Sequence, residues 1–187
     1  DVIAEERRLG ENDPQQRLFE DFQSTAFKAH PYGEPVIGHM SDVQTITRRE
    51  AEQWFATYYR ASNLTVALVG DVDPAAARVL VEKYFGRLPR GEKPEPVETV
   101  EPPQAGERRC TIAAPAEPVL LVGYHRPAVQ DPESPAVDVL ADILGEGRTS
   151  RLYRALVKEQ KLAADAGAWA YGVGGKYPSL LVVSVVP

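Results

Sequence analysis

The sequence has little of several features that would point directly to a function. Its 187 residues include a single cysteine, Cys110, which excludes an internal disulfide and a cysteine-based zinc cage. No run approaches the ~18 apolar residues of a membrane-spanning helix, and the longest apolar stretch, 180–186, is short and β-branched. No basic stripe accompanies the net charge of −6, so nucleic-acid binding is not expected.

What is present is an ordinary soluble composition, with Lys and Arg interspersed among Glu and Asp. We expect a soluble chain of the bacterial cytoplasm or periplasm, and a lone cysteine does not distinguish these compartments.

The chain starts without an initiator Met, inside a helical pattern, and stops just after a predicted strand. We therefore expect both ends to be cut and parts of any active site to lie outside the sequence. Exposed sheet edges would then favour a homodimer, unless the chain buries them itself.

Helix signals dominate residues 1–90. Apolar residues recur at helical spacing over residues 1–9. Asp13-Pro14 and Asp73-Pro74 each place an Asp N-cap before proline, which predicts helices from there to about residues 29 and 84. Thr47 and Glu50 form a capping box that opens a further helix.

The same part of the chain contains one predicted strand. Residues 64–69 are apolar and β-rich and end at Gly70, which predicts a buried strand. The helix before it carries Trp54, Phe55 and Tyr58 at helical spacing, and we expect these side chains to face inward.

Residues 91–107 differ in character from the rest of the chain. Prolines stand there among Glu and Gly with few large apolar residues, which is typical of a semi-extended linker. Beyond the linker we predict strands at residues 109–113, 119–124, 166–173 and 180–186, and helices beginning at Asp131-Pro132 and spanning 151–160. The fold class is therefore α+β: two linked α/β sandwich-like parts, each with a mostly antiparallel or mixed sheet covered by helices.

One charged residue stands out in the first helical pattern. Glu6 falls near the middle of the apolar face, whereas Arg7 and Arg8 point elsewhere. That face is formed by Val2, Ile3 and Leu9. Burial of an unpaired carboxylate is costly, so Glu6 should have a basic side chain, backbone donors or a metal ion as partner. The alternative is a frayed helix end with Glu6 partly in water.

Other reactive side chains lack the spacing that a site would need. His30, His39 and His125 show neither H-x-x-x-H nor H-x-x-E-H, and we interpret them as loop or surface histidines. Ser150 follows two glycines but lacks the lysine of a phosphate-binding loop, and we expect it to cap a helix. Nothing marks Cys110 as a nucleophile.

Several short motifs occur in an informative order. They are residues 1–6 (DVIAEE), 30–33 (HPYG) with 37–38 (IG), 47–63, 64–73 (LTVALVGDVD) and 151–163. Together they resemble the pitrilysin, insulinase and mitochondrial-processing-peptidase family of zinc peptidases over nearly the whole chain. The resemblance implies a peptidase unit of two similar α/β domains. Zinc would be held in the first domain by two histidines of an inverted H-x-x-E-H motif and a downstream Glu.

Position for position, Glu6 matches that downstream Glu. The resemblance therefore implies that a zinc ion is the partner that a buried Glu6 would need. By the same resemblance, residues 1–90 are the C-terminal part of the first, zinc-site domain. Residues 91–107 are the linker, and residues 108–187 are the N-terminal part of the second domain.

The chain departs from the family pattern in two places. It contains no H-x-x-E-H, and a catalytic zinc needs three protein ligands and an open position. We therefore expect Zn²⁺ in the parent protein, none tightly bound to this fragment, and no hydrolysis by the isolated chain. Some family domains also hold substrate with R-x-x-x-x-L-x-Y, where this chain has Val157 and Ala164 in place of the Arg and Tyr. A complementary half or partner subunit would supply that pair.

Three hypotheses follow. The first is a fragment of a zinc-dependent metalloendopeptidase that acts on peptides. The second is a non-catalytic structural or binding subunit of the same family. The third is an unrelated α+β binding domain, in which strands 108–113 and 118–125 need not share a sheet with the last two strands.

Overall fold

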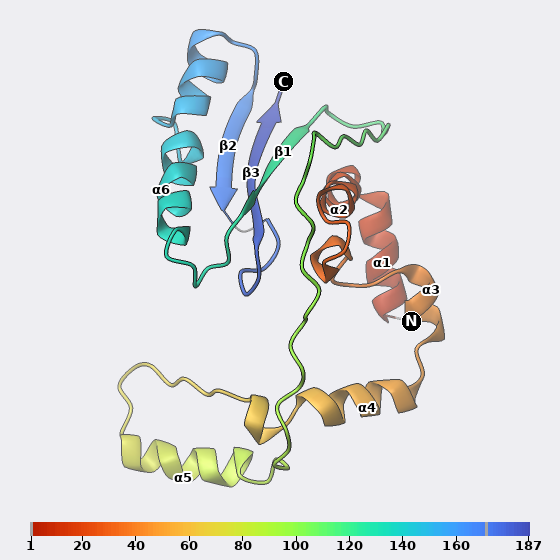
Figure 1. Ribbon diagram of the computed structural model, residues 1–187, viewed down its shortest axis with the longest axis vertical. Helices are drawn as coiled ribbons and strands as arrows, with labels where there is room; N and C mark the ends of the chain where they lie inside the picture. The colour runs from red at the N-terminus through yellow and green to blue at the C-terminus, as the bar shows by residue number, and fades with distance from the viewer. Residues whose placement is uncertain (1, 171) are drawn as a thin grey trace. The chain divides into compact units, whose positions relative to one another are not determined.

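The computed structural model describes residues 2–170 and 172–187 (Figure 1). The chain separates into two compact units, one formed by Asp1–Met40 with Thr99–Pro187 and the other by Ser41–Glu98. The assignment of residues 1–90, 91–107 and 108–187 to two domains and a linker stays a prediction.

The first unit is built on a three-stranded antiparallel sheet. β1 (Leu120–Arg126), β2 (Asp165–Ala170) and β3 (Ser179–Val186) lie in the order β1-β3-β2, so that β3 is central. In the register, Gly123 of β1 lies opposite Val182, and Ala168 of β2 lies opposite Val183. The central place suits β3 because its Val and Leu side chains favour a strand with neighbours on both edges.

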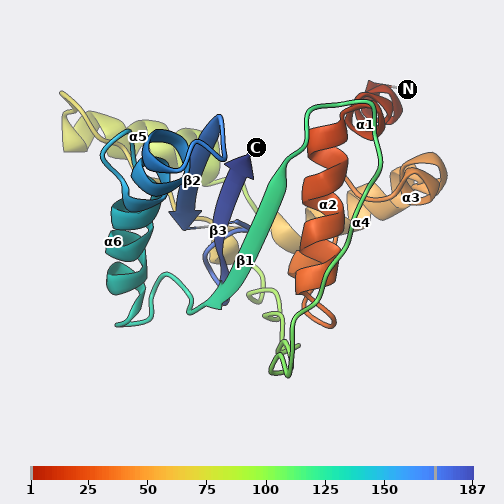
Figure 2. The same ribbon diagram turned by 90° about the horizontal axis from the view of Figure 1, so that it is seen from above.

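Helices cover both faces of this sheet (Figure 2). α6 (Ser134–Gly145) packs on β2 and β3, while α2 (Pro14–Ala26) lies on the other face, where Phe22 approaches Gly123. Side chains alternate along a strand, and Leu180 and Val182 cluster with Phe27 on the α2 side at 1% and 0% exposure. The core of the first unit therefore lies between β3 and the end of α2.

Local capping sets where α2 begins. The Oδ1 atom of Asp13 accepts hydrogen bonds from the backbone N–H groups of Gln15 and Gln16 at 2.8 and 3.4 Å, and Pro14 takes the first helical position. The predicted start is confirmed, and the helix ends at Ala26 rather than near residue 29. α1 (Val2–Asn12) precedes it, and a 3₁₀ turn, η1 (Pro31–Gly33), follows.

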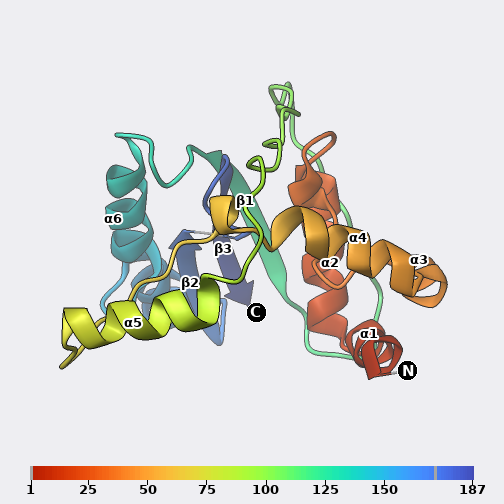
Figure 3. The same cartoon turned by 90° about the horizontal axis from the view of Figure 1, so that it is seen from below.

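The second unit consists of helices joined by irregular chain (Figure 3). Its elements are α3 (Met40–Thr45), α4 (Arg48–Tyr58), η2 (Ala61–Asn63) and α5 (Pro74–Phe85). The predicted capping box is confirmed, because the Thr47 N–H donates to Glu50 Oε2 at 2.8 Å and the Glu50 N–H donates to Thr47 Oγ1 at 3.3 Å.

The predicted buried strand at residues 64–69 is wrong for this chain. The segment is extended but unpaired, and Leu68 and Val69 are 58% and 96% exposed. The physical reason is that no strand lies beside it among the described residues, and a strand needs a hydrogen-bonded neighbour.

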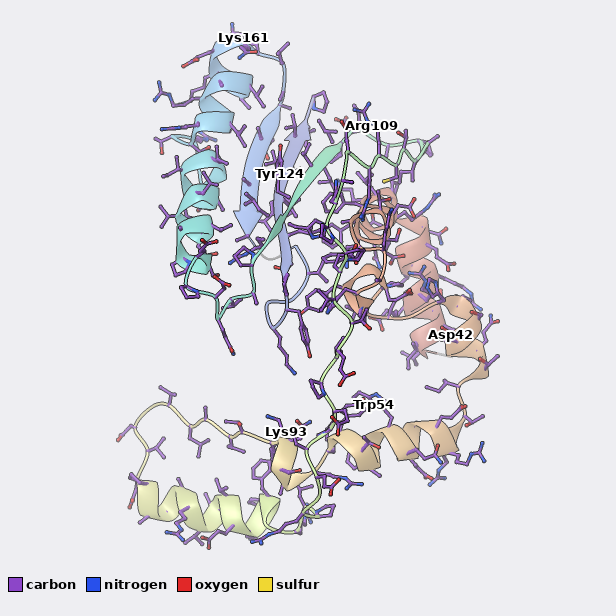
Figure 4. The ribbon with its side chains drawn as sticks, viewed as in Figure 1. Asp42, Trp54, Lys93, Arg109, Tyr124 and Lys161 are labelled. Carbon is purple, nitrogen blue, oxygen red and sulfur yellow. The ribbon has the colours of Figure 1, made fainter. Side chains whose placement is uncertain are left out.

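The expected inward packing of α4 is also wrong. Trp54, labelled on α4 in Figure 4, is 57% exposed, and Phe55 is 53% exposed. The rings stack along the helix instead, with the centroids of Phe55 and Tyr59 at 4.3 Å. No residue of Ser41–Glu98 is buried in the described structure, because there is no sheet within this unit for the apolar face of α4 to pack on.

Three further differences lie beyond residue 98. Residues 109–113 form no strand, because no neighbouring strand among the described residues pairs with them. The strand predicted at 166–173 ends at Ala170, and residue 171 lies outside the described residues. The helix predicted at 151–160 is a π-helix, η3 (Tyr153–Glu159), in which the Gln160 N–H donates to the Ala155 carbonyl at 2.9 Å.

The contact between α6 and β2 generates a test of the fold. A Cβ on Gly145 would collide with the backbone nitrogen of Ala168, which is main chain and has no room to yield. We expect Gly145→Ala to destabilise the first unit by about 1–3 kcal/mol through overpacking, measured by denaturant unfolding. Gly106→Ala is the control, because nothing lies within 4 Å of a Cβ at Gly106. Equal stability of the two variants would contradict the close packing.

Candidate functional site on helix α1

Glu6 lies on α1, but it is not buried. The carboxylate is exposed, and Val2, Ile3 and Leu9 around it are 82%, 57% and 66% exposed. The apolar face predicted from the sequence therefore exists, with Glu6 inside it, but nothing among the described residues packs against that face. Of the two predicted alternatives, a buried Glu6 is therefore wrong and a Glu6 in contact with water is observed, although the helix around it is formed rather than frayed. Its predicted role as a metal ligand stays a prediction.

Glu6 also differs from the other carboxylates of α1 in its partners. Glu5 pairs with Arg8 Nη1 at 2.9 Å, and Glu11 lies 3.3 Å from Arg7 Nε. No hydrogen bond or ion pair of Glu6 is present among the described residues. Glu6 is thus a carboxylate available to a ligand, surrounded by apolar side chains.

Arg7 is the residue that sequence reasoning missed. Arg7 was expected to point away from the apolar face of the helix and therefore to be exposed. It does point away from that face, but it is only 8% exposed, because the side of α1 on which it lies packs against α2. Its Nη1 donates to both carboxylate oxygens of Glu20 at 2.6 and 2.7 Å. The hydrogen bond to Glu20 raises the pKa of Arg7 against the opposing effect of burial. The only signal in the sequence was the spacing of Arg7 and Gly10, which lie on one face.

Glu20 and Gly10 complete this contact. Gln16 Nε2 donates to Glu20 Oε1 at 3.2 Å, so that Glu20 accepts from two side chains. Gly10 is buried, and a Cβ there would collide with the side-chain amide of Gln16. The face of α1 that meets α2 is therefore polar and closely fitted, whereas the apolar face is the exposed one.

The histidines do not supply the missing metal ligands. His39 Nε2 lies 2.8 Å from Glu34 Oε2 on an exposed loop, and His125 Nε2 lies 3.1 Å from the carbonyl of Ala26. Among the described residues, no group of three or more His, Cys, Asp and Glu side chains could hold a metal ion. Glu6 thus offers one oxygen ligand of a type that zinc accepts, and further ligands would have to come from elsewhere.

His30 has a structural place. It was interpreted as a loop or surface histidine, but it is buried at 6% exposure, directly before η1. Its Nδ1 accepts from the Tyr32 N–H at 3.1 Å, and its ring packs against Tyr32 and Tyr177 with centroids 4.5 and 5.1 Å away. Burial lowers the pKa of His30, opposed by the nearby charge of Glu101. His30 therefore joins the turn after α2 to the loop before β3.

Glu101 is a second residue that the sequence did not mark, because it lies in the predicted linker. Its carboxylate accepts from the backbone N–H groups of Lys28, Ala29 and His30 at 2.8–3.1 Å. Burial alone would raise the pKa of Glu101, but these donors and Arg108 outweigh it and lower the pKa to about 2. The segment from Thr99 onward is thereby fastened to the end of α2.

Ser150 and Cys110 were also considered from the sequence. Ser150 is buried, at 4% exposure, and its hydroxyl has no partner among the described residues, so it does not cap η3 as expected. Cys110 is half-buried and free.

None of the described helices is long and apolar enough to cross a bilayer.

Comparison with known proteins identifies the family. Residues 45–185 match the model of the peptidase M16 inactive domain. The chain belongs to the peptidase M16 family. It is 35% identical over 170 residues to zinc protease PqqE of Helicobacter pylori, covering 88% of this chain and 38% of the relative. It is 30% identical to an uncharacterized zinc protease of Mycobacterium leprae, covering 98% of this chain and 45% of the relative.

The solved structures agree with this M16 assignment. The crystal structure of a protease from Helicobacter pylori superposes with a TM-score of 0.88 at 32% identity, covering 99% of this chain and 45% of that one. The resemblance to zinc peptidases and the α+β fold class are thus confirmed. β1, β2 and β3 share one sheet. The hypothesis of an unrelated binding domain had allowed the strand at β1 to lie in a different sheet from the last two strands. The chain spans less than half the length of these M16 relatives.

The Glu101 contact predicts a pH-dependent stability. The folded pKa of about 2 lies below the ordinary 4.5, so the contact stabilises fully above pH 4.5 and is lost as the pH falls toward 2. We expect Glu101→Gln to lower the unfolding free energy by about 2–3 kcal/mol at pH 7, and by much less near pH 3, measured by denaturant unfolding across this range.

Glu107→Gln is the matched control for this test, since the side chain of Glu107 is 72% exposed and pairs with Arg109 at the surface. A deficit of Glu101→Gln that is equal at pH 3 and pH 7 would contradict the charged, amide-bound carboxylate.

Proposed function

We propose that the protein containing this chain is a zinc-dependent endopeptidase and that Glu6 is one of its zinc ligands. The observation that carries the proposal is the unpaired carboxylate of Glu6 in the exposed apolar face of α1. Family membership and relatives named zinc proteases support it. The other ligands would come from an H-x-x-E-H motif, which this chain does not contain.

The residues of α1 would contribute in three ways. Glu6 would present a carboxylate oxygen, while the side chains of Val2, Ile3 and Leu9 would exclude water from that ligand once covered. A bound zinc polarises a carbonyl and lowers the pKa of a bound water. Since one ligand of the three is present, the isolated chain is expected to be inactive.

The substrate in this proposal is a peptide, and part of its binding site would come from another chain or half. Val157 lies in η3 and Ala164 directly precedes β2, where family members with a substrate-holding pair have Arg and Tyr. Neither side chain can pair with a peptide carbonyl or carboxylate. A complementary half or partner subunit would supply this pair. The bacterial cytoplasm or periplasm and a homodimer of this chain stay predictions.

A second candidate function is a non-catalytic subunit of the M16 family. The matched model describes an inactive domain, and the chain lacks both H-x-x-E-H and the Arg/Tyr pair. In that case Glu6 would be covered by a basic side chain of a partner rather than by a metal ion.

Zinc binding distinguishes the two functions. In the whole protein, we expect Glu6→Gln to weaken zinc binding by more than ~100-fold, because a metal ligand is lost, measured by competition with a chromogenic chelator. Glu5→Gln is the control on the adjacent residue, which is exposed and paired with Arg8. Unchanged zinc affinity in Glu6→Gln would exclude Glu6 as a ligand, and a wild-type protein without zinc affinity would favour the non-catalytic subunit.

A further inference from the structure

The polar contact between α1 and α2 bears on the direction in which Glu6 points. Arg7 is adjacent to Glu6 in the sequence and is the only charged residue of α1 that the described structure buries. Its side chain is 10% exposed and that of Glu20 is 19% exposed, so the ion pair is largely shielded from water. Charge-assisted bonds of 2.6 and 2.7 Å in such surroundings are strong and directional.

Several contacts prevent α1 from rotating about its own axis. Nη1 of Arg7 is fixed by both carboxylate oxygens of Glu20, which belongs to α2. One turn later, the backbone at Gly10 lies directly against Gln16, which itself donates to Glu20. Rotation would break the ion pair and leave a buried charge unpaired, which is strongly unfavourable.

The rotation of α1 determines where the Glu6 carboxylate lies. Neighbouring residues of a helix are about 100° apart around its axis, so holding Arg7 against α2 turns Glu6 to the side, toward the exposed apolar face. A helix rotation of roughly 20° would move a side-chain tip 5 to 6 Å from the axis by about 2 Å. Zinc–oxygen distances tolerate only about ±0.2 Å.

We propose that Arg7 is the positioning residue for Glu6: its ion pair with Glu20 fixes the rotation of α1 and so presents the Glu6 carboxylate in the geometry that the metal requires. This inference rests on the proposed function. Arg7 touches neither metal nor substrate, and it acts through the helix that it shares with Glu6.

The test uses the whole protein with Arg7→Met, Arg7→Lys and Glu20→Gln. We expect Arg7→Met to lower zinc affinity about 10-fold, as the loss of other supporting contacts of metal ligands does. Glu20→Gln should have a smaller effect in the same direction, and Arg7→Lys should recover part of the loss. In the Co²⁺-substituted protein, the d–d absorption bands should shift in Arg7→Met, because the ligand geometry changes.

Arg8→Met is the matched control, because Arg8 is the next residue of α1, its side chain is 54% exposed, and its bond of 2.9 Å to Glu5 is at the surface. It should leave both the affinity and the Co²⁺ spectrum unchanged. A purely structural role of Arg7 would lower the melting temperature of the metal-free protein without altering the Co²⁺ spectrum of the folded fraction, and that result would overturn the inference.

The outcomes separate this inference from the function on which it rests. If Glu6→Gln keeps wild-type zinc affinity, the proposed function fails. If Glu6→Gln loses zinc while Arg7→Met and Glu20→Gln behave like Arg8→Met, the function stands and the positioning role is refuted. Should Arg7→Met fail to fold, the Co²⁺ spectra and zinc affinities of Arg7→Lys and Glu20→Gln test the positioning role instead. Wild-type spectra and affinities in both of these variants would refute it.

Discussion

The first unit depends on β3 having hydrogen-bonded neighbours on both edges. β1 and β2 pair with the backbone of β3 on both edges, and this allows Leu180 and Val182 to be buried to 1% and 0% exposure without orphaned backbone groups. α6 covers one face, and the end of α2 with the His30 turn covers the other, where Glu101 fastens the incoming chain to the same turn.

Residues 64–69 show the same kind of sequence without such neighbours. The run is nearly as rich in Val and Leu as β3, yet its backbone is unpaired and Val69 is 96% exposed. The aromatic side chains of α4 are exposed for the same reason, since a helix buries its apolar face only against another layer. An apolar run therefore has the potential to form a strand, and whether it does depends on what lies beside it.

This difference explains which features could be predicted from the sequence. The caps at Asp13 and Thr47 were predicted correctly because donor and acceptor lie within three residues of each other. The burial of Glu6 was predicted wrongly, because burial requires a covering layer and no described residue packs on the apolar face of α1. The roles of Arg7 and Glu101 were missed because their partners are 13 and 71–73 residues away, and no local pattern announces such contacts.

In the proposed metal site, the two faces of α1 would have complementary roles. The polar face fixes the helix on α2 before any metal is present, whereas the apolar face holds Glu6 exposed and unpaired. Covering Val2, Ile3 and Leu9 would stabilise the protein by burying apolar area, but it would also remove water from the Glu6 carboxylate. A cation bound at Glu6 would offset the cost of removing water from the carboxylate. Covering this face and binding a metal would therefore favour each other, and α1 would reach its most stable state only with both.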